Sequence, residues 1–422
     1  MAAAPSHRAV WFAAWPVTAV FALSNTATPL YVLWQERIGF SSGTLTVIFA
    51  CYIVGLLGAL PVAGVTSDRI GRRPVLLPAL ALGVVAGVVF ATATSVAALA
   101  VARLLTGVAV GVVVSAGMAA VTDVAGPERR RLGALLASTA MVLGAGLGPM
   151  LAGVLSQTLP APTVTVFLLE IALLGLAVVV VLRLPLRGPT RPASTGPWIR
   201  LPSVPRANRR ELLLGIAVFA PGITATSYVL SLGPSLLSRL LGTDNRMVAG
   251  LMAFVMFGAA TGVQFAVRRV AVRSVLLAGA VAGVAAMTGL VIAVYQASVP
   301  LLLGTAALAG TAQGLGQLGG LTLLGEAVPA ERRAEANAAL NTGGYIPAGL
   351  LPVAAGYLAD AVGLTAATTA FATVVLLAAA TGAVLAVGVA RETASETPKG
   401  PPASAARMAS ETPKGPSASA SR

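Results

Sequence analysis

A short charged loop at residues 64–74 lies between two long apolar segments and contains the first residues that could do chemistry. Its charged residues and glycines are Gly64, Asp68, Arg69, Gly71, Arg72 and Arg73. A carboxylate beside guanidinium groups can form ion pairs that make and break a contact between helix ends. Gly71 permits a tight turn, and Pro74 suits the first turn of a following helix. A plain turn between two helices would carry similar charges, so the loop must be weighed with the rest of the chain.

Two ionisable residues, Arg103 and Glu170, lie inside apolar segments. A charge at membrane depth costs at least about 2.5–3.5 kcal/mol, so each side chain should face a cavity or a partner. A carboxyl group in apolar surroundings could carry a proton, which makes Glu170 a candidate for moving protons. The simpler alternatives are an arginine packed against a carbonyl or carboxylate, and a protonated glutamic acid that hydrogen-bonds a neighbour.

Composition indicates that lipid solvates most of this chain. Of its 422 residues, 57% are hydrophobic and 10% are charged, against about 25% charged in an average protein. A helix crosses a bilayer with about 20 mainly apolar residues, because every backbone polar group is then paired internally. Twelve apolar runs are long enough, near residues 10–33, 44–65, 75–94, 96–121, 132–155, 163–182, 212–237, 247–267, 274–295, 299–325, 336–358 and 365–389. We therefore predict an all-α membrane protein with twelve transmembrane helices.

The net charge of +14 suggests nucleic-acid binding, but the positions of the basic residues do not. Most arginines fall in alternate loops and in residues 183–210, and both lysines fall after residue 390. This is the positive-inside pattern of membrane proteins, which places both termini in the cytoplasm. We expect no nucleic-acid partner, and we expect the protein in the plasma (inner) membrane of a bacterium, surrounded by lipid.

The sequence repeats itself at an offset of 203 residues. The shift pairs Gly107 with Gly310, Gly111 with Gly314, Glu128-Arg129-Arg130 with Glu331-Arg332-Arg333, Pro149 with Pro352 and Gly153 with Gly356. Glycines alone could coincide, but a charged triplet and a proline in the same register make chance a poor explanation. We predict two six-helix bundles, at 1–182 and 212–390, joined by a cytoplasmic linker at 183–211 and followed by a disordered cytoplasmic tail at 391–422.

The spacing G-x-x-x-D-R-x-G-R-R-P at residues 64–74 resembles the signature between helices 2 and 3 of the major facilitator superfamily of secondary transporters. The resemblance implies two six-helix bundles with a substrate site at their interface near the bilayer midplane. It also implies that Asp68 lies against the N-terminus of helix 11, whose dipole favours an anion, and that Arg72 pairs with Asp123. Such a latch would hold the bundles together on the inner side; its residues are Gly64, Asp68, Arg69, Gly71, Arg72, Arg73 and Asp123.

Two further motifs carry the same resemblance. Arg103-x-x-Thr106-Gly107-x-x-x-Gly111 resembles the helix 4 signature of the family, in which the arginine is implicated in proton coupling. The pattern at residues 144–153 resembles the helix 5 signature of drug/proton antiporters; the matching positions are Gly144, Gly148, Pro149 and Gly153. This resemblance favours export over import, although generic helix packing would also use glycines that let neighbouring helices approach closely.

Polar residues that could line a central cavity are few: Asn25, Tyr52, Ser227, Tyr228, Gln264, Gln313, Gln317 and Asn341. We expect about half of such residues to point elsewhere. Apolar walls with few polar groups suit a small amphipathic organic compound. Catalysis is not expected, because His7 is the only histidine and both lysines lie in the tail, outside any phosphate-binding loop.

We therefore expect a secondary active transporter that works as a monomer, without cofactor or metal, by alternating access. An ion gradient, in the first place of protons, would drive export of a small amphipathic molecule. Two alternatives stay open: a proton-coupled importer of a small metabolite, and a transporter-like membrane receptor that binds its ligand without moving it.

We predict that Asp68→Asn abolishes transport and leaves the amount of protein in the membrane unchanged, because the latch needs the carboxylate. Substrate flux in vesicles and an immunoblot of the same vesicles measure the two quantities. Wild-type transport by this variant would remove the latch interpretation.

Overall fold

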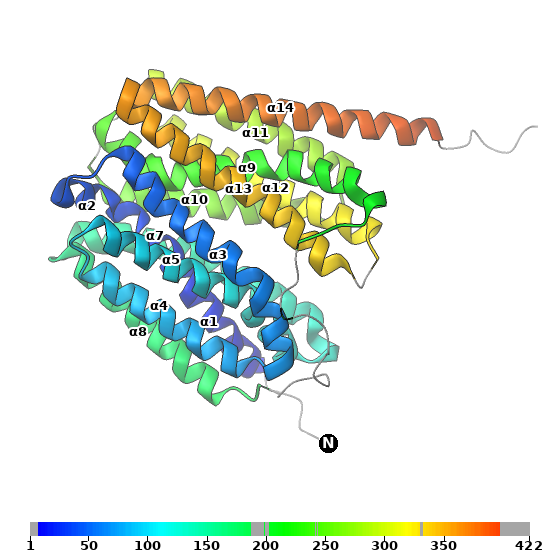
Figure 1. Ribbon diagram of the computed structural model, residues 1–422, viewed down its shortest axis with the longest axis horizontal. Coiled ribbons are helices and arrows are strands. Elements are labelled where there is room, and N and C mark those ends of the chain that lie inside the picture. The colour runs from blue at the N-terminus through cyan, green and yellow to red at the C-terminus, as the bar shows by residue number, and fades with distance from the viewer. Residues whose placement is uncertain are drawn as a thin grey trace, which may run out of the picture.

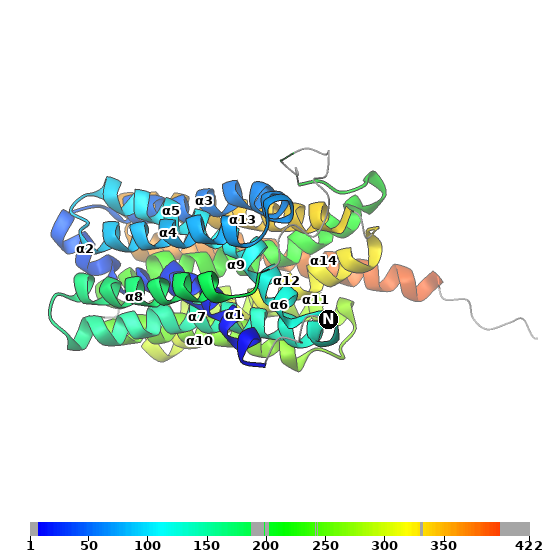
Figure 2. The same cartoon turned by 90° about the horizontal axis from the view of Figure 1, so that it is seen from below.

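The computed structural model describes residues 7–186, 198, 202–240, 242, 244–329 and 332–396. In these ranges twelve helical spans are long and apolar enough to cross a membrane, and there is no strand. The long helices run side by side along one direction (Figures 1 and 2). The predicted all-α membrane protein with twelve transmembrane helices is confirmed.

The first half of the chain supplies six spans. The first span is broken: α1 (His7–Thr26) ends at a short turn, Thr28–Leu30, and α2 (Tyr31–Ile38) completes it. The fourth span consists of α5 (Val96–Val112), a wider π-type turn at Val113–Gly117, and α6 (Met118–Ala125). The other four are α3 (Ser42–Ile70), α4 (Arg73–Ala91), α7 (Arg130–Thr158) and α8 (Pro162–Arg183).

The second half also supplies six spans. They are α9 (Arg209–Arg239), α10 (Arg246–Ala266), α11 (Val272–Tyr295), α12 (Val299–Ala327), α13 (Arg333–Val362) and α14 (Leu364–Glu396). Helix α14 continues beyond residue 390, so its last residues occupy the start of the segment that we expected to be a disordered tail. Residues 397–422 and, within the predicted linker, residues 187–197 and 199–201 lie outside the described residues.

Helix boundaries follow the local chemistry of the chain. The side chains of Ser41, Ser95 and Ser298 accept hydrogen bonds from backbone N–H groups of the first turn, which caps α3, α5 and α12. Gly71, with φ of +96°, ends α3, and Pro74 follows in the first turn of α4. We call the end of the molecule that holds Gly71 the inner end and the end that holds Ser41 the outer end, after the orientation expected from the arginines.

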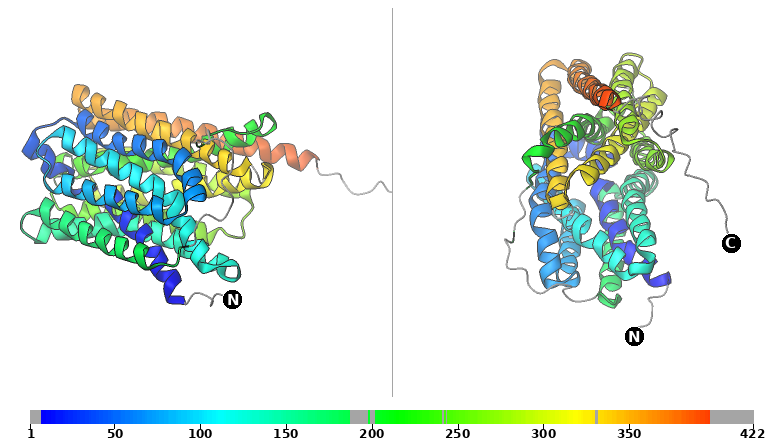
Figure 3. Two further views of the ribbon diagram at one scale, coloured as in Figure 1. Left: turned by 60° about the horizontal axis from the view of Figure 1, so that its bottom comes forward. Right: turned by 90° about the vertical axis from the view of Figure 1, so that its right-hand side faces the viewer.

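The two halves form two bundles that stand side by side, as the view along the helices shows (Figure 3, right). Equivalent glycines make equivalent contacts in each bundle: Gly107 of α5 lies against the backbone of Tyr52 in α3, and Gly310 of α12 lies against the backbone of Met256 in α10. The missing side chain lets the two helices touch backbone to backbone. The duplicated sequence thus corresponds to a duplicated packing.

We predict that Gly310→Ala destabilises the protein, whereas Gly304→Ala on the same helix does not. A Cβ atom at residue 310 would collide with the carbonyl oxygen of Met256, but no atom lies within 4 Å of a Cβ atom at residue 304. Overpacking a close contact costs about 1–3 kcal/mol. Thermal unfolding in detergent should show a lower midpoint for Gly310→Ala only; equal midpoints for both variants would contradict the contact.

Candidate functional site

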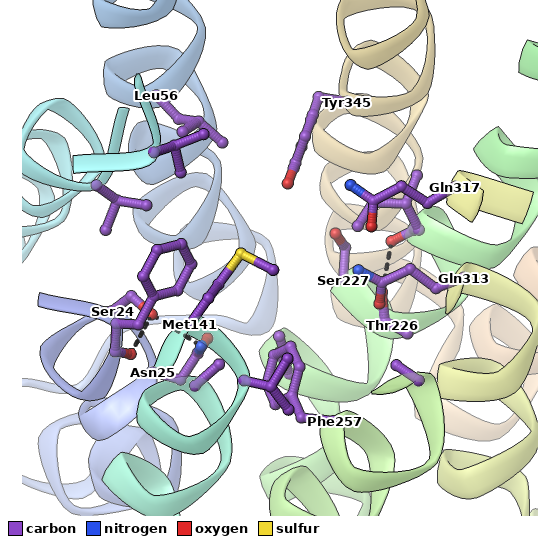
Figure 4. A pocket seen from close by; sticks show the side chains of 18 of the residues that line it. Ser24, Asn25, Leu56, Met141, Thr226, Ser227, Phe257, Gln313, Gln317 and Tyr345 are labelled. Atoms are coloured by element: carbon purple, nitrogen blue, oxygen red, sulfur yellow. Dashed lines mark hydrogen bonds between the residues drawn. The ribbon is translucent and has the colours of Figure 1, made fainter. Parts of the chain in front are cut away.

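A cavity of about 1120 Å³ lies at the interface of the two bundles. Helices α1, α3, α5 and α7 form one wall, and α9, α10, α12 and α13 form the opposite wall (Figure 4). The lining reaches Gln264, which is close to the inner end of α10 at Ala266. This volume includes space that is open to solvent. Concave sites between helix bundles are common places for small-molecule binding.

The two walls of this cavity differ in chemistry. The wall of the first half is mainly apolar and includes Phe21, Phe49, Leu56, Val114 and Met141. The wall of the second half carries hydroxyl groups from Thr226, Ser227, Thr261 and Tyr345, and in addition four carboxamides. In Figure 4 the amide ends of Gln313 and Gln317 point into the space that faces Met141.

Most of the predicted cavity residues lie on these walls. Asn25 and Tyr52 belong to the first wall, and the four carboxamides of the second wall are those of Gln264, Gln313, Gln317 and Asn341. The expectation that about half of the candidates would point elsewhere was too pessimistic. Sequence reasoning missed Thr261 and Tyr345, although each is within one helical turn of a predicted member and so shares its face of the helix.

Tyr228 is the exception, and its position corrects the prediction. Its ring stacks on Phe371 with 4.1 Å between the ring centroids, and its hydroxyl group shares a hydrogen bond of 2.6 Å with Thr368 of α14. Ser227 lines the cavity instead, because adjacent residues of a helix point about 100° apart. Tyr228 therefore fastens α9 to α14.

Arg103 lies behind the first wall and is fully buried. Its guanidinium donates hydrogen bonds to the hydroxyl group of Tyr31 and to the backbone carbonyl of Ser24, while its Nη2 has no hydrogen-bond partner. The rings of Phe49 and Tyr52, which line the cavity, have their centroids 5.3 and 6.0 Å from the guanidinium carbon. These distances allow cation–π attraction. Arg103 itself is not in the lining, but it contacts residues that are, so its positive charge lies directly behind the cavity wall.

Glu170 reaches the same turn of α1. Its side chain is almost fully buried, Oε1 accepts a hydrogen bond of 2.8 Å from Thr26, and Oε2 has no partner. Arg103 is hydrogen-bonded to Ser24 and Glu170 to Thr26. The two ionisable side chains therefore contact the two ends of the tripeptide Ser24–Asn25–Thr26. Its middle residue, Asn25, lines the cavity and donates a hydrogen bond of 2.9 Å to the hydroxyl group of Ser24.

The charged loop at the inner end forms a cluster within the first half. Arg72 donates hydrogen bonds to Asp68 at 2.8 Å, to Asp123 at 3.0 Å and to Ser67 at 2.9 Å. The structure thus contains the expected pair of Arg72 with Asp123. Asp68, however, was expected against the start of helix 11, which is α13. Its carboxylate instead binds Arg72 in its own half, and the side chain is 52% exposed.

The other residues of the predicted latch also contact the first half or the linker. Arg73 donates a hydrogen bond of 2.7 Å to the carbonyl of Leu184, just after α8. The guanidinium of Arg69 lies over the ring of Trp198 in the linker, 4.3 Å from its centroid. Gly64 faces Ser115 of the π-type turn at van der Waals distance. The loop therefore fastens α3, α4 and α6 together and also contacts the linker.

At the outer end, several hydrogen bonds join the two bundles, among them Arg246 to the carbonyl of Ser156 at 2.6 Å and Ser235 to Gln35 at 3.2 Å. Two of the contacts are equivalent in the repeat, and we call these two the outer clasp (Ser42, Gly43, Gln157, Arg246 and Asp360). The carboxylate of Asp360 accepts hydrogen bonds from the N–H groups of Ser42 and Gly43, at 2.9 and 2.8 Å. The side chain of Gln157 accepts one from the N–H group of Arg246, at 3.2 Å. Gln157 matches Asp360 in the repeat, and Gly43 matches Arg246. Each contact caps a helix of the opposite half, and the charged one also meets the positive end of a helix dipole.

The glycines of the α7 motif allow close packing of neighbouring helices on two faces of α7. Gly144 and Gly148 lie against the backbone of α1 within the first half. Gly153 lies against the backbone of Arg246, and the carbonyl of Pro149 lies against Gly250 in α10. The motif therefore packs α7 within its own bundle and also against the second bundle near the outer clasp.

A duplicated six-helix bundle, a cavity between the halves and the loop at 64–74 together describe a known family. The sequence model of the Major Facilitator Superfamily matches residues 10–296 and 264–418. The chain belongs to the Major Facilitator Superfamily. Its members are membrane transporters, so the resemblance seen in the loop is confirmed.

Named relatives point to one branch of this family. The multidrug resistance protein MdtL of Escherichia coli and that of Shigella flexneri are each 28% identical to this chain over 221 residues. The alignment covers 50% of this chain and 54% of each relative. The chain thus matches about half the length of these curated relatives, which supports the predicted resemblance to the drug/proton antiporter branch.

Solved structures share the fold at low sequence identity. A crystal structure of a mutant of the nucleoside transporter NupG has a TM-score of 0.72 and 13% identity, over 89% of this chain and 99% of that chain. A bacterial homolog of the human lysosomal transporter Spinster, in an inward-facing and unoccupied conformation, has a TM-score of 0.69 and 14% identity, over 90% of this chain and 96% of that chain. Both likenesses show the fold of the chain.

We predict that Asp360→Asn increases the fraction of molecules in which the outer clasp is separated. Hydrogen bonds to a charged acceptor contribute about 1.5–3 kcal/mol each, and an amide oxygen replaces the carboxylate poorly between two N–H groups. Spin labels at Thr94 and Gln296, which are exposed at the outer ends of the two halves, should report a larger share of long distances.

Arg37→Gln, which removes an exposed charge at the same end, serves as the control and should leave the distances unchanged. Identical distance distributions for Asp360→Asn and the unchanged protein would show that Asp360 does not hold the outer ends together.

Proposed function

We propose that this protein is a proton-coupled exporter of a small amphipathic organic compound. The observation that carries the proposal is the cavity of about 1120 Å³ between two bundles, with an apolar wall on one side and uncharged polar groups on the other. Such a lining binds molecules that combine an apolar body with a few polar groups.

Alternating access is supported by the unequal contacts at the two ends. The outer clasp joins the bundles through Asp360 and Gln157, while the charged cluster of Arg72, Asp68 and Asp123 stays within the first half. With both termini in the cytoplasm, this is an inward-facing arrangement. In the outward-facing arrangement the clasp would separate and the inner ends would meet, with Asp68 at the start of α13.

Export is supported by the relatives named multidrug resistance protein and by the motif of α7. Proton coupling is supported by the geometry around Asn25. A carboxyl group that gains or loses a proton at Glu170 changes its hydrogen bond with Thr26, and Thr26 is the neighbour of a cavity residue. One proton moving down about 100 mV and one pH unit supplies about 3.7 kcal/mol, enough for a several-hundred-fold substrate gradient.

Uptake into inside-out membrane vesicles with an acidic interior tests this function. The probes are three uncharged aromatic or heterocyclic compounds (chloramphenicol, thiamphenicol and thymidine) and two cations (tetraphenylphosphonium and ethidium). At least one probe should accumulate, and dissipating the proton gradient should abolish its accumulation. Proton-driven loss of a probe from preloaded vesicles would instead identify an importer, and binding without flux would identify a receptor.

We predict that Glu170→Gln removes the dependence of transport on the pH gradient, because an amide cannot take up the proton. Transport measured from pH 5.5 to 8.5 should become flat in this variant, while downhill counterflow of the probe persists. Glu128→Gln, which changes an exposed glutamate at the inner end, should keep the profile of the unchanged protein. An unaltered pH profile in Glu170→Gln would exclude Glu170 from coupling.

A further inference from the structure

The described lining of the cavity contains no side chain that carries a charge at neutral pH. Among the described residues that line it, none is Asp, Glu, Lys, Arg or His. An ion that leaves water for such a site needs a counter-charge, because uncharged walls replace its hydration poorly. A cavity built to carry ions would be expected to place such a counter-charge on its surface.

A positive charge behind the lining makes binding of a cation in the cavity less favourable still. The guanidinium of Arg103 lies behind the first wall, beside the rings of Phe49 and Tyr52. These aromatic rings already interact with a positive charge, so they offer less cation–π attraction to a cation in the cavity. Arg103 is fully buried and is not part of the lining, and it donates hydrogen bonds to Tyr31 and to the carbonyl of Ser24, so it does not present its charge directly to an anion in the cavity.

The second wall offers hydrogen bonds that the protein itself does not use. Within the described residues, the side-chain amides of Gln264, Gln313, Gln317 and Asn341 make no hydrogen bond. Oε1 of Gln313 is buried without a protein partner, so it can accept a hydrogen bond from water or from a ligand in the cavity. Each carboxamide has one acceptor oxygen and two N–H donors, so this wall presents alternating donors and acceptors.

We propose that the transported compound is an uncharged amphipathic molecule with adjacent hydrogen-bond donors and acceptors, such as amide and hydroxyl groups or a heterocyclic edge. Its polar edge lies against α12 and α13, where Gln313, Gln317 and Asn341 bind it. Its apolar part lies against Phe21, Leu56 and Met141 of the first wall. This inference rests on the proposed function in taking the cavity as the transport site.

The charge of the substrate fixes how export responds to voltage. Exchange of an uncharged molecule for one proton moves one net positive charge inward, so membrane potential alone drives export. A potential of about 100 mV then supports roughly a fiftyfold gradient. Exchange of a monovalent cation for one proton moves no net charge and does not respond to potential.

Equilibrium binding to the purified full-length protein in detergent tests the substrate class, with the five probes named above. At least one of chloramphenicol, thiamphenicol and thymidine should bind, and tetraphenylphosphonium and ethidium should bind at least tenfold more weakly. Tighter binding of either cation, or no binding by any uncharged probe, overturns the proposal.

Variants at the second wall locate the bound probe. Gln313→Leu and Gln317→Leu should each weaken binding of the uncharged probe at least tenfold, whereas Gln296→Leu, at an exposed glutamine, should leave it unchanged. Gln313→Glu should increase the affinity for tetraphenylphosphonium at least tenfold, because it supplies the missing counter-charge. Unchanged affinities in all three cavity variants place the probe elsewhere and overturn the assignment.

Transport in liposomes separates this proposal from the proposed function. If an uncharged probe binds and is also transported when a potassium–valinomycin potential is applied without a pH gradient, that result supports both the exporter and the substrate class. A probe that binds as described but is not moved by any proton gradient overturns the exporter and leaves the binding class standing. A cation that binds tightly and is exported in exchange for protons overturns the substrate class and leaves the exporter standing.

Discussion

Backbone contact between helices at glycine is the interaction on which this structure depends. Lipid is as apolar as a leucine side chain, so burial of apolar surface does not drive transmembrane helices together. Gly107 against Tyr52 and Gly310 against Met256 bring the second and fourth helix of each bundle into contact. These contacts keep each bundle compact, and two compact bundles leave a cavity between them.

The outer clasp shows how a duplicated chain can join two bundles reversibly. Gln157 and Asp360 occupy equivalent positions, and each caps the first turn of a helix from the other half. One of the two carries a charge and the other does not, so the two sides of the interface are related in geometry but differ in strength. Each contact of the clasp consists of backbone N–H groups that donate to a single side chain from the other half, a geometry that can separate without unfolding either helix.

Charge is kept apart from the cavity surface. Arg103 and Glu170 are buried in the first bundle and contact the two ends of the tripeptide Ser24–Asn25–Thr26, whose middle residue lines the cavity. A change of protonation at Glu170 can therefore reach the cavity through α1 without a charge entering it. The first bundle holds the ionisable groups, and the second bundle holds the amide and hydroxyl groups that would bind a substrate.

The sequence by itself determined the twelve spans, the duplication and most of the cavity residues, because hydropathy, the repeat and the spacing of polar residues along a helix can be read along the chain. The Arg72–Asp123 pair followed from the family resemblance of the loop, and the structure contains it. Only the tertiary structure decided that Tyr228 packs on Phe371 while Ser227 faces the cavity, since neighbouring helices select which face of α9 points inward. It also decided that Asp68 binds Arg72 rather than α13 and that Asp360 joins the outer ends. Those contacts depend on how the two bundles are tilted against each other, and no local pattern encodes that tilt.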